Sequence, residues 1–169
     1  MGLEDKLTVD RPFMPGYGLQ PAETGLGLFP WTQVQEKMEA ARNYWLGTVQ
    51  PDARPHAAPV WGIWVDDVFY FGTGRESRKA RNLLANPSIV VHLESGDDVI
   101  IIEGYVEVVT DMALLTRMDA IYQAKYNVAL LGEHPVFAVR PQTAYAWVEK
   151  DFPGSATRWH ITDQGFAQG

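Results

Sequence analysis

The sequence predicts a mainly β protein, in which short antiparallel strands form a barrel and helices flank or plug it. Short strand-like stretches follow one another from residue 44 to residue 148, and most are separated by tight turns such as Gln50–Ala53 and Asp66-Asp67. Two Gly-x-Gly pairs near the N-terminus do not lie between a strand and a helix, so a dinucleotide-binding α/β fold is not indicated. A length of 169 residues fits one such domain.

The N-terminal segment differs in composition from the rest. Residues 1–30 are rich in proline and glycine and predict an extended arm, not a separate domain. Residues 31–169 then form a single domain. The aromatic residues of the arm indicate packing on another surface, such as a second subunit, and disorder is the alternative.

The expected strands differ in length and are joined mainly by turns. They are predicted at residues 44–49, 56–65, 68–73, 88–93, 99–109, 136–139, 143–148 and 158–161. Trp61 and Trp64 belong to the second strand and are expected to share a face.

Three helices are expected among these strands. Thr32–Gln35 matches the T-x-x-Q pattern of a capping box, which predicts a helix start. A second helix follows the 68–73 strand and ends near Asn86-Pro87, because the residue before a proline disfavours the helical conformation. Thr110 or Asp111 caps a third helix, which has one apolar side.

Composition excludes several classes of function. The chain has 14 Lys and Arg against 21 Asp and Glu, and this net charge of −7 argues against broad nucleic-acid binding. No apolar run is long enough to span a bilayer, and no apolar signal core is present, so a cytoplasmic protein is expected. Cysteine is absent, which excludes disulfides and thiol catalysis. No metal site is expected, because ligand spacing is lacking among the four histidines, His56, His92, His134 and His160.

The start of the second helix is unusually basic for an acidic chain. Four cations gather there: Arg75, Arg78, Lys79 and Arg81. A helix N-terminus normally favours carboxylates, so cations there indicate a bound anion. Together with backbone N–H groups and the hydroxyls of Thr73 and Ser77, they predict a phosphate site. A solvated basic helix end remains the alternative from charge alone.

The same region carries a family resemblance. From about residue 32 to residue 149, the chain resembles the flavin/deazaflavin split-barrel superfamily, of which pyridoxamine 5'-phosphate oxidase is the best-known member. The segments that carry this resemblance are Phe71-Gly72-Thr73, Ser77-Arg78-Lys79, Asn86-Pro87 and Glu103-Gly104. The resemblance implies a six-stranded antiparallel split β-barrel of the FMN-binding type, and a homodimer with the cofactor between its subunits.

The resemblance also implies roles for individual residues. Arg78 and Lys79 would hold the cofactor phosphate, and Gly72 and Thr73 would contact the phosphate or the ribityl chain. The second strand would run along the ring. The implied cofactor-binding set is therefore Pro59, Val60, Trp61, Gly62, Gly72, Thr73, Arg75, Ser77, Arg78 and Lys79.

Two family features concern the substrate side. The oxidases carry a Gln four residues before their Glu-Gly pair, where this chain has Val99. They also have a C-terminal Arg-x-His that grips the substrate phosphate, and Arg158-Trp159-His160 keeps that spacing here. A terminal strand with an exposed Arg is the alternative for these residues. No catalytic acid or base can be assigned from the sequence.

One branch of the superfamily is the most similar. Ala41–Leu46 and Lys79–Leu83 look like segments of the actinobacterial proteins that use the deazaflavin coenzyme F-420. The resemblance implies an oxidoreductase that transfers hydride between reduced F-420 and a small organic substrate. Two alternatives remain: an FMN-dependent oxidase or reductase of the pyridoxamine phosphate oxidase type, and a non-enzymatic binder of flavin, deazaflavin or haem.

Overall fold

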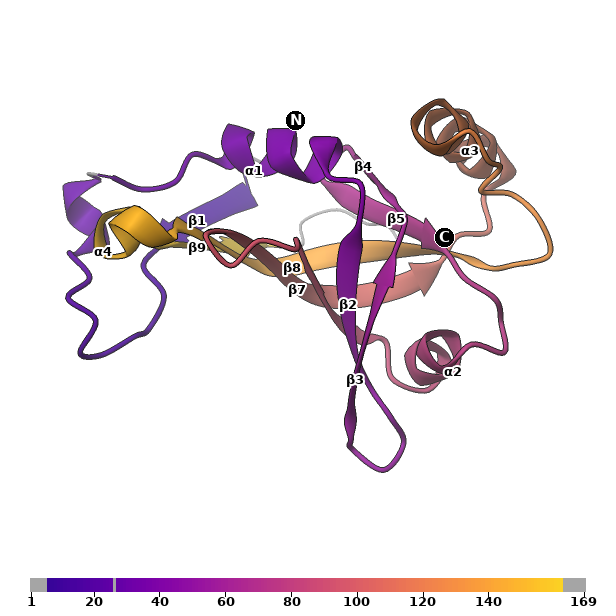
Figure 1. The fold of residues 1–169 in the computed structure, drawn as a ribbon, viewed down its shortest axis with the longest axis horizontal. Helices are drawn as coiled ribbons and strands as arrows, with labels where there is room; N and C mark the ends of the chain where they lie inside the picture. Colours follow the sequence, from indigo (N-terminus) through magenta and orange to yellow (C-terminus); the bar gives the residue numbers. More distant parts are fainter. Residues whose placement is uncertain (1–5, 26, 163–169) are drawn as a thin grey trace.

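A computed structural model describes residues 6–25 and 27–162, and one antiparallel sheet dominates this part of the chain (Figure 1). Nine strands belong to it, in the order β1-β9-β8-β7-β6-β2-β3, with β5 on β8 and β4 on β5. Their bounds are β1 Leu7–Asp10, β2 Tyr44–Val49, β3 Pro55–Val60, β4 Ile63–Val65, β5 Val68–Gly72, β6 Ser88–His92, β7 Asp98–Val108, β8 Val136–Val148 and β9 Thr157–Ile161.

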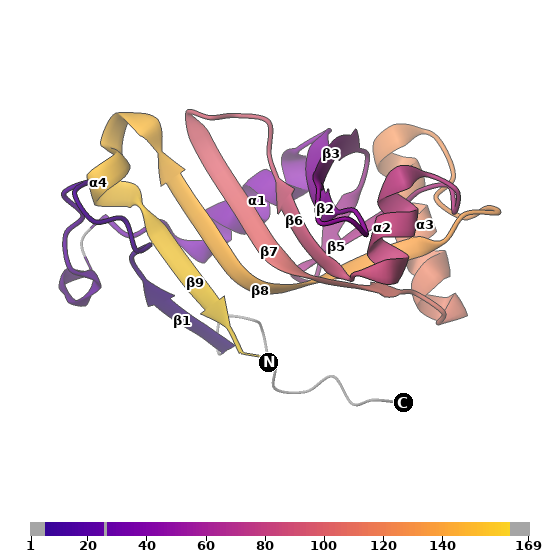
Figure 2. The same cartoon turned by 90° about the horizontal axis from the view of Figure 1, so that it is seen from below.

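The strands curl into a split barrel that does not close. Hydrogen bonding continues from β4 through β5, β8, β7, β6 and β2 to β3, and it stops where β3 passes into β4 at Trp61-Gly62. The mainly β fold with flanking helices is therefore confirmed. The predicted count of six strands is reached when β3 and β4 are taken as one strand; β1 and β9 extend the sheet beyond the barrel (Figure 2).

Two strand predictions were wrong in their bounds. The 56–65 strand breaks at Gly62, where an added Cβ would lie 2.3 Å from the Phe69 ring. The backbone passes too close to that ring for any larger residue. The two late strands are one strand, β8, which continues past Pro141 through an irregularity opposite Glu103 and Gly104.

The helices are α1 (Trp31–Ala40), α2 (Arg78–Ala85), α3 (Met112–Tyr126) and the short α4 (Phe152–Ser155). The predicted capping box was wrong: α1 begins after Pro30, and Gln35 instead donates to the Asp67 carboxylate. Asp111, and not Thr110, caps α3 by accepting from the backbone N–H groups of Ala113 and Leu114. Two 3₁₀ turns, at Ala22–Thr24 and Glu149–Asp151, complete the described elements.

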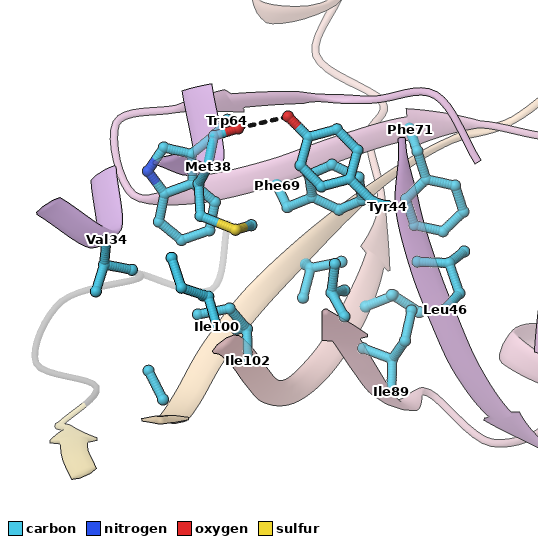
Figure 3. Packing of buried hydrophobic residues seen from close by; sticks show 14 of the residues in the cluster. Val34, Met38, Tyr44, Leu46, Trp64, Phe69, Phe71, Ile89, Ile100 and Ile102 are labelled. Atoms are coloured by element: carbon cyan, nitrogen blue, oxygen red, sulfur yellow. Dashed lines mark hydrogen bonds between the residues drawn. The ribbon is translucent and has the colours of Figure 1, made fainter. Parts of the chain in front are cut away.

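The main core lies between α1 and the concave side of the sheet (Figure 3). Val34 and Met38 of α1 are fully buried against sheet residues such as Ile100 and Ile102. Burying side chains of this size supplies about 1.5–3 kcal/mol each, so α1 is fixed mainly by its apolar face. A second apolar cluster joins α3 to the outer side of β4, β5 and β8, with Met118 fully buried.

The two tryptophans of the 56–65 segment do not share a face, contrary to the prediction. Trp64 is buried in the main core and packs edge-on against Trp31. Trp61 is 38% exposed in the break between β3 and β4. The two tryptophans are three positions apart, and at an odd spacing the alternating side chains of an extended chain point to opposite sides.

Part of the N-terminal arm packs on its own chain. Strand β1 pairs with β9, and its Thr8 lies opposite His160. Arg11 is buried and donates to the backbone carbonyls of Gly154 and Ala156 next to α4. The domain boundary expected at residue 30 is thus crossed by contacts between the arm and the C-terminal strand.

Candidate functional site

The turn between β5 and α2 is built by its own hydroxyl groups. The Ser77 hydroxyl accepts from the Ala80 N–H at 3.2 Å and caps α2. It also lies 3.1 Å from the hydroxyl of Thr73, which is 9% exposed. The Ser77 N–H donates to the Gly74 carbonyl at 2.9 Å. These hydrogen bonds hold the loop in one conformation. The free backbone N–H groups of the first turn of α2 therefore have a fixed orientation.

The cations of this turn are not neutralised by carboxylates. Among the described residues, Arg75, Arg78 and Lys79 take part in no side-chain hydrogen bond and no ion pair. Arg81 differs, because its guanidinium donates to the Glu76 carbonyl at 2.9 and 3.0 Å and so braces the loop. We call Thr73, Arg75, Ser77, Arg78 and Lys79 the basic cluster. Of these predicted residues, Thr73 and Ser77 are joined through their hydroxyls, and the three cations lie beside them in the turn and the first residues of α2.

The β2–β3 hairpin packs beside α2 through a buried polar contact. Asn82 is fully buried, and its Nδ2 donates to the Thr48 hydroxyl at 2.9 Å. The same hydroxyl lies 3.5 Å from Nδ1 of His56, its cross-strand neighbour. The Oδ1 of Asn82 is buried and has no hydrogen-bond partner among the described residues.

Asp52, at the tip of the β2–β3 hairpin, interacts electrostatically with two arginines. Hydrogen bonds from Arg54 are the main cause that lowers the pKa of the Asp52 carboxyl, and the positive charge of Arg78 adds to the effect. Asp52 is exposed, so this interaction is screened by solvent.

The loop between α3 and β8 also reaches the basic cluster, which sequence reasoning did not anticipate. An added Cβ on Gly72 would lie 3.1 Å from Leu130, and one on Gly74 would lie 3.8 Å from His134. His134 is thus a neighbour of the turn. Its position depends on a long-range contact, and no local sequence signal marks it.

The residues expected along the cofactor ring are held by α3. Trp61 stacks on Tyr126 with ring centroids 4.8 Å apart and 6° between the planes. The Arg42 guanidinium lies 5.0 Å from the Trp61 ring. The Gly62 N–H donates to the Tyr126 hydroxyl at 3.1 Å. Within the described part of the chain, no hydrogen bond or ring contact joins this region, Pro59 and Val60 included, to the basic cluster.

Lys125 links the same region to neighbouring segments through three hydrogen bonds. Its ammonium group donates to the Tyr44 hydroxyl at 2.8 Å, the Glu39 carbonyl at 3.1 Å and the Gly62 carbonyl at 3.2 Å. Burial lowers the pKa of Lys125 to about 8, because the low-polarity surroundings disfavour the charged form. Burial likewise raises the pKa of Tyr126.

A groove lies on the face of the hairpin that points away from α2. We call it the sheet groove; it has a volume of about 620 Å³. Thr48 points to α2, so its neighbours Gly47 and Val49 point the opposite way, into the groove. None of the predicted cofactor-binding residues lines it. The lining residues are Gly47, Thr48, Val49, Pro55, His56, Ala57, Ser88, Ile89, Val90, Glu103, Gly104 and Gln142.

The two residues expected on the substrate side are placed differently from each other. Arg158 lines a second cavity of about 320 Å³, together with Glu103 and Tyr145. Its Nη2 donates to Asp10 at 2.8 Å, while its Nε is buried without a partner among the described residues. His160 is exposed and lines neither that cavity nor the sheet groove.

Comparison with known families decides the membership of the chain. A family profile described as pyridoxamine 5'-phosphate oxidase matches residues 31–148, which include the hairpin, the basic cluster and the bulge at Gly104. The chain belongs to the pyridoxamine 5'-phosphate oxidase family. Among proteins with curated descriptions, none matches the sequence.

Solved structures agree with this membership at the level of the fold. A conserved hypothetical protein from Mycobacterium tuberculosis has 20% identity and a TM-score of 0.64, with 83% of this chain and 95% of that chain covered. An F-420 reductase has 23% identity and a TM-score of 0.53, with 65% and 94% covered. HutZ, a heme storage protein from Vibrio cholerae, has 17% identity and a TM-score of 0.59, with 68% and 92% covered.

Two features, a metal-binding cluster and a membrane-spanning helix, are absent from the described residues. No group of three or more His, Cys, Asp or Glu side chains in residues 6–25 and 27–162 is arranged to hold a metal ion. In the same residues, no helix is long and apolar enough to cross a membrane.

Proposed function

We propose that this member of the pyridoxamine 5'-phosphate oxidase family binds coenzyme F-420 through its basic cluster and transfers hydride between the reduced coenzyme and a small organic molecule. The observation that carries the proposal is the charge of the cluster. Arg75, Arg78 and Lys79 form no ion pair among the described residues, in a chain of net charge −7. Asp52, whose carboxyl the charge of Arg78 affects, is paired with Arg54 at 2.7 Å.

The donor set of the basic cluster fits a phosphate group. Two hydroxyls, Thr73 and Ser77, lie beside the first turn of α2, where free N–H groups attract anions. Arg78 supplies a fork of donors that matches phosphate oxygens, and Lys79 supplies a point charge. The bound coenzyme supplies the hydride chemistry, and the chain holds and orients it. Gly72, Thr73 and the cations form the phosphate end of the proposed site.

An FMN-dependent oxidase or reductase is the second candidate, because FMN also ends in a phosphate that the same cluster would hold. The F-420 assignment is preferred on charge: three unpaired cations suit a longer anion than a single phosphate. A binder of flavin, deazaflavin or haem without turnover is the third candidate, and the heme storage protein of the same fold motivates it.

We also propose a homodimer formed by the outer face of the sheet. Gly47, Ala57 and Val90 form a small-residue, largely apolar floor in the sheet groove, which a second copy would cover. The basic cluster is on the other side of the same hairpin, so the cofactor would lie beside the interface. We expect Val90→Asp to give monomers in analytical ultracentrifugation, because it also places a carboxylate opposite Glu103. Val108→Asp, at a 44% exposed position outside the groove, is the control.

The test of cofactor identity is a pair of fluorescence titrations of the purified, cofactor-stripped protein with F-420 and with FMN. We expect F-420 to bind preferentially. Arg78→Ala should weaken binding by about 1.5–3 kcal/mol, the scale of a charge-assisted hydrogen bond. Arg117→Ala is the control, because Arg117 is an exposed arginine of α3 whose guanidinium is paired with Asp66 at 2.8 Å.

Each other outcome has a distinct meaning. Preference for FMN moves the protein to the second candidate, and Arg158→Ala and His160→Ala then become tests of oxidase activity. Tight binding without turnover against a panel of carbonyl and unsaturated compounds favours the third candidate. Binding of neither ligand, or an Arg78→Ala variant with unchanged affinity, removes the basic cluster from the function.

A further inference from the structure

The loop between α3 and β8 brings a histidine to the basic cluster that the proposed function has not used. Strands β5 and β8 pair antiparallel as far as Gly72, the last residue of β5 (Figure 1). The two segments stay together one residue further, because the Thr73 N–H donates to the Pro135 carbonyl at 3.4 Å. The next residues in this register are Gly74 on the turn and His134 on the loop.

The contact between these two residues is direct. A Cβ added to Gly74 would lie 3.8 Å from Cε1 and 3.9 Å from Nδ1 of His134. Because glycine has no side chain, the imidazole lies against the backbone of the turn. Gly74 is between Thr73 and Arg75, two members of the basic cluster. The histidine is therefore a neighbour of the cluster by contact, and not only by its place in the chain.

The imidazole of His134 is open to a ligand. His134 is exposed, and its side chain takes part in no hydrogen bond and no ion pair with the described residues. A neutral imidazole has one N–H donor, and a charged imidazole has two. In either form the ring can donate a hydrogen bond to an oxyanion, so this role does not require a change of charge.

The loop that carries His134 is held at both ends. The Asp119 carboxylate of α3 accepts from the backbone N–H groups of Leu130 at 2.7 Å and Leu131 at 2.9 Å. Leu130 is also 6% exposed and belongs to the second apolar cluster. At the other end the chain is held by the bond from Thr73 to the Pro135 carbonyl. A ligand therefore meets a histidine whose backbone is already ordered, which lowers the cost of binding.

We infer that His134 is a further ligand of the phosphate group held by the basic cluster; this rests on the proposed function. Arg75, which follows Gly74, forms no ion pair among the described residues, so positive charge and an imidazole donor lie on the same turn. The α3–β8 loop thus adds a donor to a site whose other groups all come from the β5–α2 segment.

The experiment measures the Kd of wild type, His134→Ala and His134→Gln by fluorescence titration with F-420 and with FMN. The Gln variant keeps an N–H donor on a side chain of similar reach. Glu133→Ala is the control, because Glu133 is the exposed neighbour in the same loop, and removing a carboxylate beside an anion site does not weaken anion binding. The same variants are titrated with riboflavin and with the phosphate-free deazaflavin riboside, and circular dichroism checks that each is folded.

We expect His134→Ala to raise the Kd of the phosphate-bearing ligand about three- to tenfold, the range for one net hydrogen bond. His134→Gln should recover most of this loss, and Glu133→Ala should bind at least as tightly as wild type. The Kd of the phosphate-free ligands should not change. If their binding is too weak to measure, the Gln variant decides: recovery supports the inference, and a loss equal to that of His134→Ala overturns it.

Two other results also overturn the inference. One is an unchanged Kd for His134→Ala, and the other is an equal loss with ligands that lack the phosphate. In both cases the proposed function stands as long as Arg78→Ala still weakens binding. If wild type binds neither F-420 nor FMN, the proposed function itself fails, and the role of His134 fails with it.

Discussion

Gly104 occupies a position where the structure admits only glycine. It lies in β7 at the irregularity opposite Arg140 and Pro141. A Cβ added to Gly104 would lie 2.0 Å from the Arg140 carbonyl oxygen and 2.9 Å from its carbonyl carbon. Real Cβ atoms essentially never approach closer than 3.0 Å, so the two strands must separate locally by about 1 Å, the difference between 3.0 and 2.0 Å. Both contacts are backbone atoms, which no rotamer change can move.

The expected cost of Gly104→Ala follows from this separation. Overpacking of this kind costs about 1–3 kcal/mol. Weakening one or two ladder hydrogen bonds between β7 and β8 adds about 1 kcal/mol each. We therefore expect a loss of about 2–5 kcal/mol in the free energy of unfolding, which for a chain of this size lowers Tm by roughly 4–20 °C.

The assay is urea unfolding followed by tryptophan fluorescence, together with a thermal melt by circular dichroism. Gly96→Ala is the matched control, because a Cβ at Gly96 meets nothing within 4 Å. The control should keep its Tm within about 2 °C of wild type, as expected for an exposed turn. If Gly104→Ala also melts within that margin, the argument from close backbone approach is refuted.

Three further predictions concern α3. Asp111→Ala removes the cap of this helix and should cost about 1 kcal/mol in a urea titration, with no change in the m-value. Tyr126→Phe leaves the buried Gly62 N–H without its acceptor and should cost about 1–3 kcal/mol by the same assay. The folded-state pKa of Lys125, about 8, is below its unfolded value of 10.5, so the group's contribution to stability should increase as the pH rises through this window. The free energy of unfolding of wild type minus that of Lys125→Met should accordingly be larger at pH 9.5 than at pH 7.5; a flat or falling difference would contradict the assignment.

The sequence predicted correctly those elements whose conformation depends on residues close together in the chain. Strand β2 was placed at residues 44–49, as observed. The Asp66-Asp67 turn adopts positive φ angles of 51° and 60°, the backbone that a tight hairpin requires. The break at Gly62 was missed because its cause is the Phe69 ring, which only the folded sheet brings to that backbone. The continuity of β8 past Pro141 was missed for a similar reason, since the bulge depends on the partner strand.

The same distinction applies to the candidate site. The residues from Thr73 to Lys79 are contiguous, so their hydroxyls and charges are visible in the sequence as one group. Thr48 is 34 residues away from Asn82, its hydrogen-bond partner, and no sequence pattern joins them. Arg81 is one of the four cations that the sequence shows there, and only the fold shows that its guanidinium donates to the loop carbonyl of Glu76. A cation in a sequence is a candidate ligand only until the fold shows what it already binds.

The two faces of the β2–β3 hairpin have different surroundings, α2 on one side and the sheet groove on the other. Because side chains alternate along a strand, Thr48 faces α2 and the basic cluster, while Gly47 beside it faces the sheet groove. A change at one position therefore leaves the neighbouring face chemically intact. If the groove is the dimer interface and the basic cluster holds the cofactor, both depend on the position of the same two strands. Dimer formation would then fix the hairpin against α2 and reduce the entropy that cofactor binding has to overcome. The proposed dimerisation and cofactor affinity should therefore be coupled through the hairpin, whose Thr48 lines the groove and also hydrogen-bonds to Asn82 of α2.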